Sequence, residues 1–488
     1  MRRTLTPAVV AAVATVLVVT LPAPAATAAP RPYLGANTAA VQDDFNGDGY
    51  RDTAVGAPGA RVGGQEAAGA VVVLYGGRGG VSTARRVVIT QNTAGVPGSA
   101  EQADGFGTAV DTADLDRDGY ADLIVGASWE TVGTMEGQGS VTVVWGGPNG
   151  LSGGASVAPP TGLREWTAFG DVLKAADVTG DGYPDLAAAS NDGAIAFTGP
   201  FTRTGAYASR RFVGPLGSTW GVTAGDLDGD GVAERVWLPG PSGGNANGDV
   251  WIEDGSGAAT ELPGAAGMVG VVADVDGDGY GDLVLGLPFD ASVSGDADRA
   301  AHEGGEVDVW YGGPEGVDPA QTPRALHQDS AGVPGGGEDG DLFGNALSAD
   351  DVNGDGFADV LVGVPGEKVG PDAGAGGVVL LRGSAAGLGG AGAAAYHQDL
   401  PEIAGGAERA DDFGRAVHLA DLDADRRPDV LVGVPGENAE GGVWFARGAA
   451  SGPVLNGSVA VSSAQAGLAA GGVPDDFGSS VNGPRSPL

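Results

Sequence analysis

The chain has 488 residues, of which 63 are acidic and 25 are basic, giving a formal net charge of −38. So acidic a surface excludes partners such as nucleic acid and anionic lipid, which require clusters of lysine and arginine. Cysteine is absent, so disulfide bonds cannot stabilise the fold.

The N-terminus has the pattern of a secretory signal peptide over residues 1–28. Arg2 and Arg3 precede an apolar stretch at residues 8–21, and small residues then lead to a cleavage site near Ala28. This stretch is too short for a typical membrane-spanning helix, and no other apolar run approaches that length. We therefore expect a secreted, extracellular protein whose mature chain, residues 29–488, is one domain without an integral membrane segment.

From Asp44 onward, the pattern Asp-x-Asp/Asn-x-Asp-Gly-x-x-Asp occurs seven times, in full or in close variants. Oxygen-bearing side chains at alternate positions of a tight loop turn inward, and the glycine permits the sharp bend. Such a cage suits a hard cation, so we expect structural Ca²⁺ in several loops, up to seven. The candidate ligands, copy by copy, are Asp44, Asn46, Asp48 and Asp52; Asp114, Asp116, Asp118 and Asp122; Asp177, Asp181 and Asp185; Asp226, Asp228, Asp230 and Glu234; Asp274, Asp276, Asp278 and Asp282; Asp351, Asn353, Asp355 and Asp359; and Asp421, Asp423, Asp425 and Asp429.

The copies differ in how completely they follow the pattern. Thr179 replaces the second ligand of the Asp177 copy, so this site is expected to bind most weakly. Arg426 replaces the glycine after Asp425 and brings a cation beside that cage. A single copy is equally compatible with an acidic β-turn that binds no ion. Seven copies at matching places in a repeat favour Ca²⁺. The EF-hand interpretation is remote, because the loops have no glutamate at the twelfth position and no helices on either side.

Each aspartate loop belongs to a longer repeat that predicts four short β-strands. One apolar run follows the loop, as at residues 122–127, and a second comes after another loop, as at residues 141–145. A Phe-Gly pair stands eight residues before several loops, at Phe106-Gly107, Phe169-Gly170, Phe343-Gly344 and Phe413-Gly414. Short strands separated by Gly, Pro and Asp are typical of antiparallel sheets, and four-stranded units of this size are typical of propeller blades.

The two ends of the chain complement each other. The first loop has Ala36-Asn37 where Phe-Gly is expected, whereas the C-terminus carries Phe477-Gly478 with no aspartate loop after it. Pairing of the C-terminal strand with the N-terminal hairpin would complete one blade and leave no open edge. We therefore predict an all-β fold, a seven-bladed β-propeller of four-stranded antiparallel blades that is closed by the two terminal segments.

The combination of Phe-Gly, the aspartate loop and Val-Gly-x-Pro resembles the FG-GAP repeats of integrin α-subunit propellers and their bacterial relatives, from about Asp44 to Val481. The resemblance implies that the calcium loops are hairpin turns on one face and that partners bind mainly through loops on the other. It implies a monomeric binding or adhesion module for an extracellular protein or glycan. Loops at residues 130–138, 288–304 and 366–376 are candidates for that surface, with Trp129, Trp166 and Phe289 either as anchors or as caps of the blade edges.

Enzymatic activity remains the alternative, as an extracellular propeller hydrolase or lyase acting on a polysaccharide or another polymer. The chain has four histidines, at positions 302, 327, 397 and 418. His327 and His397 occupy equivalent positions in two repeats, which favours a structural role over catalysis. Residues 240–244 match Gly-x-Ser-x-Gly, but a nucleophile elbow needs a strand before it and a helix after it. No catalytic residue is therefore assigned, and binding is the expected function.

Overall fold

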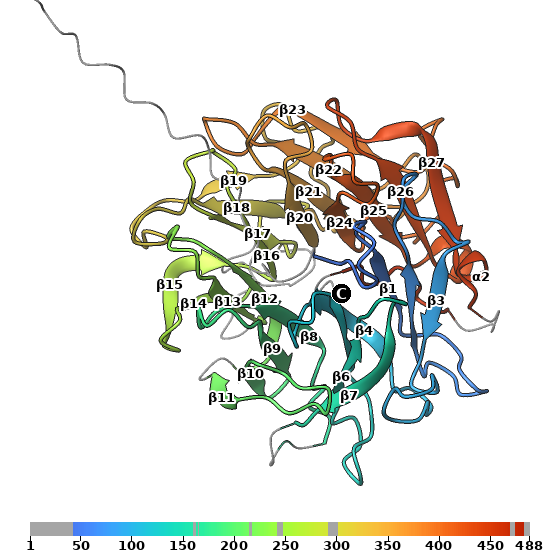
Figure 1. Ribbon diagram of the computed structural model, residues 1–488. Helices are drawn as coiled ribbons and strands as arrows, with labels where there is room; N and C mark the ends of the chain where they lie inside the picture. The colour runs from blue at the N-terminus through green and yellow to red at the C-terminus, as the bar shows by residue number, and fades with distance from the viewer. Residues whose placement is uncertain are drawn as a thin grey trace, which may run out of the picture.

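The computed structural model describes residues 42–159, 163, 165–213, 217–241, 247–290, 301–468 and 474–482. Within these ranges, the chain forms seven small antiparallel sheets arranged in a ring (Figure 1). This confirms the predicted seven-bladed β-propeller. The signal peptide at residues 1–28 and the Ala36-Asn37 pair lie outside the described residues.

The strands pair in chain order within each blade, and the innermost strand comes first in blades 2 to 7. Blades 1 to 7 contain, in turn, β1 (Thr53–Ala57), β2 (Ala70–Leu74) and β3 (Arg86–Ile89); β4 (Phe106–Ala113), β5 (Asp122–Ala127), β6 (Ser140–Trp145) and β7 (Ser152–Val157); β8 (Val172–Ala176), β9 (Asp185–Ser190), β10 (Gly193–Thr198) and β11 (Ser209–Val213); β12 (Thr219–Gly225), β13 (Glu234–Pro239), β14 (Asp249–Glu253) and β15 (Ala259–Ala266); β16 (Val269–Ala273), β17 (Asp282–Leu287), β18 (Glu306–Trp310) and β19 (Arg324–Leu326); β20 (Ala346–Asp350), β21 (Asp359–Val364), β22 (Gly377–Arg382) and β23 (Gly389–Tyr396); and β24 (Val417–Ala420), β25 (Asp429–Val434), β26 (Gly442–Arg447) and β27 (Val454–Ser462). A 3₁₀ turn, η1 (Glu437–Ala439), and a short helix, α2 (Ser463–Ala466), complete the described elements.

The hydrophobic core lies between neighbouring blades. The second strand of blade 2, β5, is buried along its whole length, whereas the outermost strand β7 is partly exposed. Val71 of blade 1 and Leu123 of blade 2 belong to one buried cluster, together with Phe106 of the Phe-Gly pair. Inner strands that are covered on both faces need apolar side chains on both faces, which explains their continuous apolar runs. Each blade is therefore stabilised by the next one around the ring.

The first blade is completed by the C-terminal segment, as predicted. Val481 pairs with Val55 in an antiparallel bridge, flanked by hydrogen bonds from Gly56 N to Ser480 O (2.9 Å) and from Asn482 N to Ala54 O (3.1 Å). Phe477 is fully buried in a cluster that joins blades 7 and 1. The described residues of the two terminal segments thus lie side by side, and this contact closes the ring.

Blades 4 and 5 have Ser218-Thr219 and Ala266-Gly267 at the positions of Phe-Gly, and this departure from the repeat predicts less regular packing there. Blade 4 does contain register shifts, between Thr219 and Gly221 and between Asp249 and Trp251. In blade 5 the pairing of β16, β17, β18 and β19 runs without a shift. Shifts also occur in the blades that have Phe-Gly, for example between β6 and β7. Loss of the pair therefore does not by itself disturb strand register.

Candidate metal centres

In blades 2 to 7 the aspartate loop joins the first strand to the second, and in blade 1 it directly precedes β1, so all of the loops lie at one end of the strands. The last acidic residue of six loops is the first residue of the second strand, as Asp122 is for β5, and Asp52 directly precedes β1. This is the predicted hairpin position. Loops between the second and third strands, and linkers from one blade to the next, lie at the opposite end.

The first aspartate of each loop organises the backbone around itself. Asp114 accepts hydrogen bonds from Asp118 N at Oδ1 (3.0 Å) and from Gly119 N at Oδ2 (3.0 Å). Gly119 has a φ of 92°, a left-handed conformation that favours glycine. The contact from the fifth following amide recurs in the loops that begin at Asp44, Asp177, Asp226, Asp274, Asp351 and Asp421. Arg426 supplies this amide where the pattern has glycine.

The last acidic residue attaches the loop to its blade. Asp122 is fully buried, and it accepts hydrogen bonds from Leu115 N at Oδ2 (2.9 Å) and from Gly146 N at Oδ1 (2.9 Å). Asp52 and Asp282 make the equivalent pairs of contacts in blades 1 and 5. A carboxylate oxygen accepts more than one contact, so these residues both hold the loop and retain lone pairs for a cation.

In three loops, carboxylate oxygens converge within 4.8 Å of one another. These groups are Asp114, Asp116 and Asp122; Asp226, Asp228 and Asp230; and Asp274, Asp276 and Asp282. Oxygens on opposite sides of a Ca²⁺ ion are separated by about 4.8 Å, twice the usual Ca–O distance. In the incomplete Asp177 loop, the buried Oδ1 of Asp177 has no hydrogen-bond partner. The oxygen-only donor sets therefore fit a hard divalent cation.

The electrostatics of the loops also favour a cation. Burial, with a contribution from the carboxylates of Asp116 and Asp114, raises the pKa of Asp122 to about 8. Burial likewise raises the pKa of Asp52 to about 8 and that of Asp282 to about 7, again with contributions from carboxylates of the same loop. A divalent ion among these groups would favour their charged forms and remove the repulsion.

Arginines contact several of the loops, which sequence reasoning missed. Arg203, between β10 and β11, pairs with Asp116 (2.7 Å) and Asp118 (2.5 Å) of the neighbouring blade. Arg85 pairs with Asp48 (2.7 Å), and Arg382 with Asp359 (2.6 Å). Each guanidinium supplies part of the positive charge that a metal ion would supply. The loops that begin at Asp44, Asp114 and Asp351 therefore have a competing cation beside them.

Two sequence patterns match this chain and fit the observed blades. The FG-GAP repeat matches residues 36–74, 106–144, 343–381 and 413–445, and an FG-GAP-like repeat matches residues 177–237. The chain is an FG-GAP β-propeller. Blade 5 lies outside the matched ranges, yet this blade of the FG-GAP propeller has the same four strands and the same aspartate loop.

Part of the FG-GAP propeller is also similar to a group of mammalian enzymes. It is 30% identical over 159 residues to phosphatidylinositol-glycan-specific phospholipase D of Mus musculus. The matched segment covers 33% of this chain and 19% of that protein. The Bos taurus protein of the same name is 32% identical over 155 residues, covering 32% of this chain and 18% of that protein. The matched part thus spans less than one fifth of these relatives. Across the described ranges, the propeller has no helix long and apolar enough to cross a membrane.

The end of the FG-GAP propeller opposite the aspartate loops carries an exposed aromatic pair. Trp129 is 45% exposed and Trp166 is 57% exposed, with ring centroids 6.4 Å apart. Phe289 is only 6% exposed and packs edge-on against Trp220, which favours the alternative that it caps a blade edge. Residues 291–300 of the expected binding loop, and residues 242–244 of the Gly-x-Ser-x-Gly match, lie outside the described residues.

Proposed function

We propose that this FG-GAP propeller is a secreted binding or adhesion module whose blade hairpins are stabilised by Ca²⁺. The observation that carries the proposal is the recurrent arrangement of the aspartate loops, in which one hydrogen-bond scheme holds carboxylates around a common centre. Calcium has a structural role here, because the loops join the two innermost strands of each blade. The export proposal is checked by N-terminal sequencing of the mature protein, which should begin near residue 29.

A partner would bind at the end opposite the calcium loops, where Trp129 and Trp166 are exposed. Aromatic side chains on loops of a rigid scaffold commonly dominate recognition, since they bury large areas at little entropic cost. The tilted pair, with an angle of 53° between the rings, offers two apolar surfaces beside acidic residues. The partner class is an extracellular protein or glycan, and the propeller is proposed to act as a monomer.

Calcium dependence is tested on protein dialysed against EDTA, by calorimetric titration and thermal melting. Addition of Ca²⁺ should raise the melting temperature, since an ion at a thousandfold excess over its Kd contributes about 4 kcal/mol per site. Asp276→Asn should weaken the effect, because it removes one of three converging carboxylates. Asp254→Asn, in a turn outside the loops, is the matched control. Absence of heat on titration and an identical melt with and without Ca²⁺ would contradict the proposal.

Binding is tested by a screen of glycans and extracellular matrix proteins. Saturable binding that is lost in Trp129→Ala and Trp166→Ala, but retained in Phe212→Ala, would support the proposed surface. Phe212 is a suitable control because it is 61% exposed and lies on the outermost strand β11. Equal binding by all three variants would exclude the aromatic pair as the recognition surface.

A hydrolase or lyase acting on a polysaccharide or another polymer is the second candidate function. The similarity to phosphatidylinositol-glycan-specific phospholipase D favours it, although that match covers only 19% of the mouse protein. Incubation with polysaccharides and with phosphatidylinositol-glycan substrates, followed by product analysis, distinguishes the two functions. Released product would establish an enzyme, whereas binding without turnover would support the module.

A further inference from the structure

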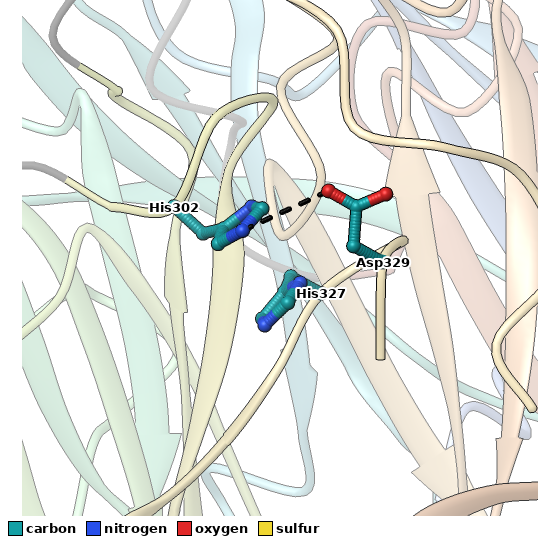
Figure 2. A group of neighbouring side chains, drawn as sticks. All are labelled: His302, His327 and Asp329. Carbon is teal, nitrogen blue, oxygen red and sulfur yellow. Dashed lines mark ion pairs between the residues drawn. The ribbon is translucent and has the colours of Figure 1, made fainter. Parts of the chain in front are cut away.

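Two histidines and an aspartate meet at the end of the propeller opposite the aspartate loops (Figure 2). His302 lies in the connection between β17 and β18, whereas His327 directly follows β19 and Asp329 comes two residues later. One ligand atom of each residue lies within 4.8 Å of the others. Unlike the aspartate loops, this cluster offers nitrogen as well as oxygen.

The hydrogen bonding of His302 fixes which of its nitrogens is free. Nδ1 lies 3.0 Å from the carbonyl oxygen of Glu303. A carbonyl only accepts hydrogen bonds, so Nδ1 carries the hydrogen and the neutral ring presents the lone pair of Nε2. Metal-binding histidines are commonly oriented by this kind of second contact. The backbone thus prepares Nε2 of His302 as a ligand.

Nε2 of His302 faces the Oδ2 atom of Asp329 at 3.7 Å. A lone pair and a carboxylate repel each other unless a proton or a cation lies between them. In tetrahedral zinc sites, nitrogen and oxygen ligands are about 3.4 Å apart, as the usual bond lengths dictate. Asp329 is also oriented, because its other oxygen accepts a hydrogen bond from Gly337 N (3.4 Å). The separation is therefore close to that needed for a shared metal ion.

The stacking of the two imidazole rings brings a second set of ring nitrogens to the cluster. The rings of His302 and His327 lie face to face, as Figure 2 shows. They are parallel within 9°, with centroids 3.6 Å apart. Two positive rings would repel each other at this separation, so at least one ring of the stack has a nitrogen lone pair available as a ligand. The buried Nδ1 of His327 has no hydrogen-bond partner. Rotation about χ2, which is soft in histidine, would let both lone pairs point to one ion.

We propose that His302, His327 and Asp329 bind a divalent transition metal of the Zn²⁺ or Co²⁺ class. Imidazole ligands select such metals over Ca²⁺, which prefers oxygen. Three protein ligands leave a coordination position open. Because the side chains of His302 and Asp329 are 35% and 51% exposed, a small molecule or a partner's side chain can reach it.

The next repeat supplies an internal comparison. His397 and Asp399 stand where His327 and Asp329 stand in the preceding repeat. Gly305 and Gly376 are equivalent, because each forms a parallel bridge to the phenylalanine of the following Phe-Gly pair. By this correspondence, Ala373 occupies the position of His302. The second repeat therefore has two of the three groups and lacks the one that completes the site.

The test uses Co²⁺ as a spectroscopic probe on the full mature chain, with saturating Ca²⁺ present throughout. Calcium fills the oxygen sites, so failure of the calcium proposal and failure of this one remain distinguishable. We expect about one Co²⁺ per chain with visible absorption typical of mixed nitrogen and oxygen ligands. His302→Ala and His302→Gln should weaken Co²⁺ binding by at least about 10-fold. Loss of a contact that only orients a ligand can already weaken metal binding by this factor, and these variants remove the ligand itself. His397→Ala should bind as the unmodified chain does.

Far-UV circular dichroism and melting curves establish that each variant is folded. Competition by Zn²⁺ that abolishes the Co²⁺ absorption would support the site. The proposal is overturned if the unmodified chain shows no Co²⁺ absorption, as expected for a simple ion pair between protonated His302 and Asp329. It is equally overturned if His302→Ala retains full affinity, or if His397→Ala loses as much affinity as His302→Ala.

Discussion

Single buried side chains connect neighbouring blades at the end opposite the aspartate loops. Gln91 donates a hydrogen bond to Glu130 of the next blade, and the contact recurs between Gln328 and Glu367 and between Gln398 and Glu437. All three glutamines are buried, with at most 5% exposure. In the repeated His-Gln-Asp segments, glutamine is therefore the residue that makes a structural contact between blades.

One such glutamate should make stability depend on pH. Burial raises the pKa of Glu130 from its usual 4.5 to about 7, and Asp104 and Glu101 contribute repulsion. Folding therefore takes up a proton when the pH lies between these two pKa values. The stabilisation that this group contributes is accordingly present in acid and is lost as the pH rises through about 7. Glu130→Gln removes the charge and keeps an acceptor for Gln91. We expect it to raise the free energy of unfolding by about 1 kcal/mol near pH 8, discounted for partial exposure, and by little near pH 5.

Denaturant unfolding at the two pH values, with Ca²⁺ in excess, measures this difference. Glu136→Gln is the control, because Glu136 is an exposed residue of the same loop. A stabilisation of equal size at both pH values would show that the charge of Glu130 is not its cause.

At the level of elements, the Phe-Gly and Val-Gly-x-Pro signatures are explained by contact between backbones of adjacent blades. A Cβ added to Gly126 of β5 would lie 1.9 Å from the carbonyl oxygen of Gly170, in the next Phe-Gly pair. The equivalent contact recurs from Gly433 to Gly478 across the closing seam. Gly170 has a φ of 91°, which also favours glycine. Both glycines are needed because the backbones of two adjacent blades are in contact there.

Gly126→Ala should consequently destabilise the propeller. The methyl group meets backbone atoms on the facing strand, so relief requires separation of two blades, at a cost of about 1–3 kcal/mol as for other overpacked sites. Thermal melting and denaturant unfolding measure the loss. Gly406→Ala is the control, since an added Cβ there meets nothing within 4 Å. Equal stability of the two variants would refute the backbone-contact explanation.

The elements could be predicted because their signals are local. Apolar runs, Phe-Gly pairs and aspartate loops recur at fixed spacing, so blade number and hairpin positions follow from the sequence. The arginine contacts could not be predicted, because Arg203 lies 87 residues from Asp116 and meets it only when two blades pack. The same holds for His302 and His327, which are brought together by the folding of blade 5. The burial of Phe289 depends likewise on Trp220 of another blade.

At the scale of the whole molecule, the C-terminal segment completes a blade that the N-terminal residues begin. Val481 pairs with Val55 as Val110 pairs with Val125 in blade 2. Asn482 adds side-chain hydrogen bonds to Ala54 N (2.6 Å) and Asp52 O (3.0 Å). Without covalent crosslinks, only noncovalent contacts join the ends of the described chain, and loss of this pairing would leave the inner edge of β1 unpaired.

A disulfide placed across this seam should stabilise the whole ring. The bonds from Gly56 N to Ser480 O and from Asn482 N to Ala54 O flank Val55 and Val481, which identifies them as a non-hydrogen-bonded pair. Such pairs have Cα atoms about 4.5 Å apart, within the range that disulfides span. The natural chain has no cysteine, so Val55→Cys with Val481→Cys can form only one intramolecular bond.

Oxidation of this double variant should stabilise it by about 2–4 kcal/mol over its reduced form, because the crosslink constrains nearly the entire unfolded chain. Thiol titration before and after oxidation measures bond formation, and melting with and without reductant measures its effect. Val55→Cys alone controls for the loss of a buried valine, since its melt should not respond to reductant. Two thiols that resist oxidation in the folded protein would mean that the ends are not paired in solution. A disulfide that forms without raising the melting temperature would mean that opening of this seam does not limit the stability of the ring.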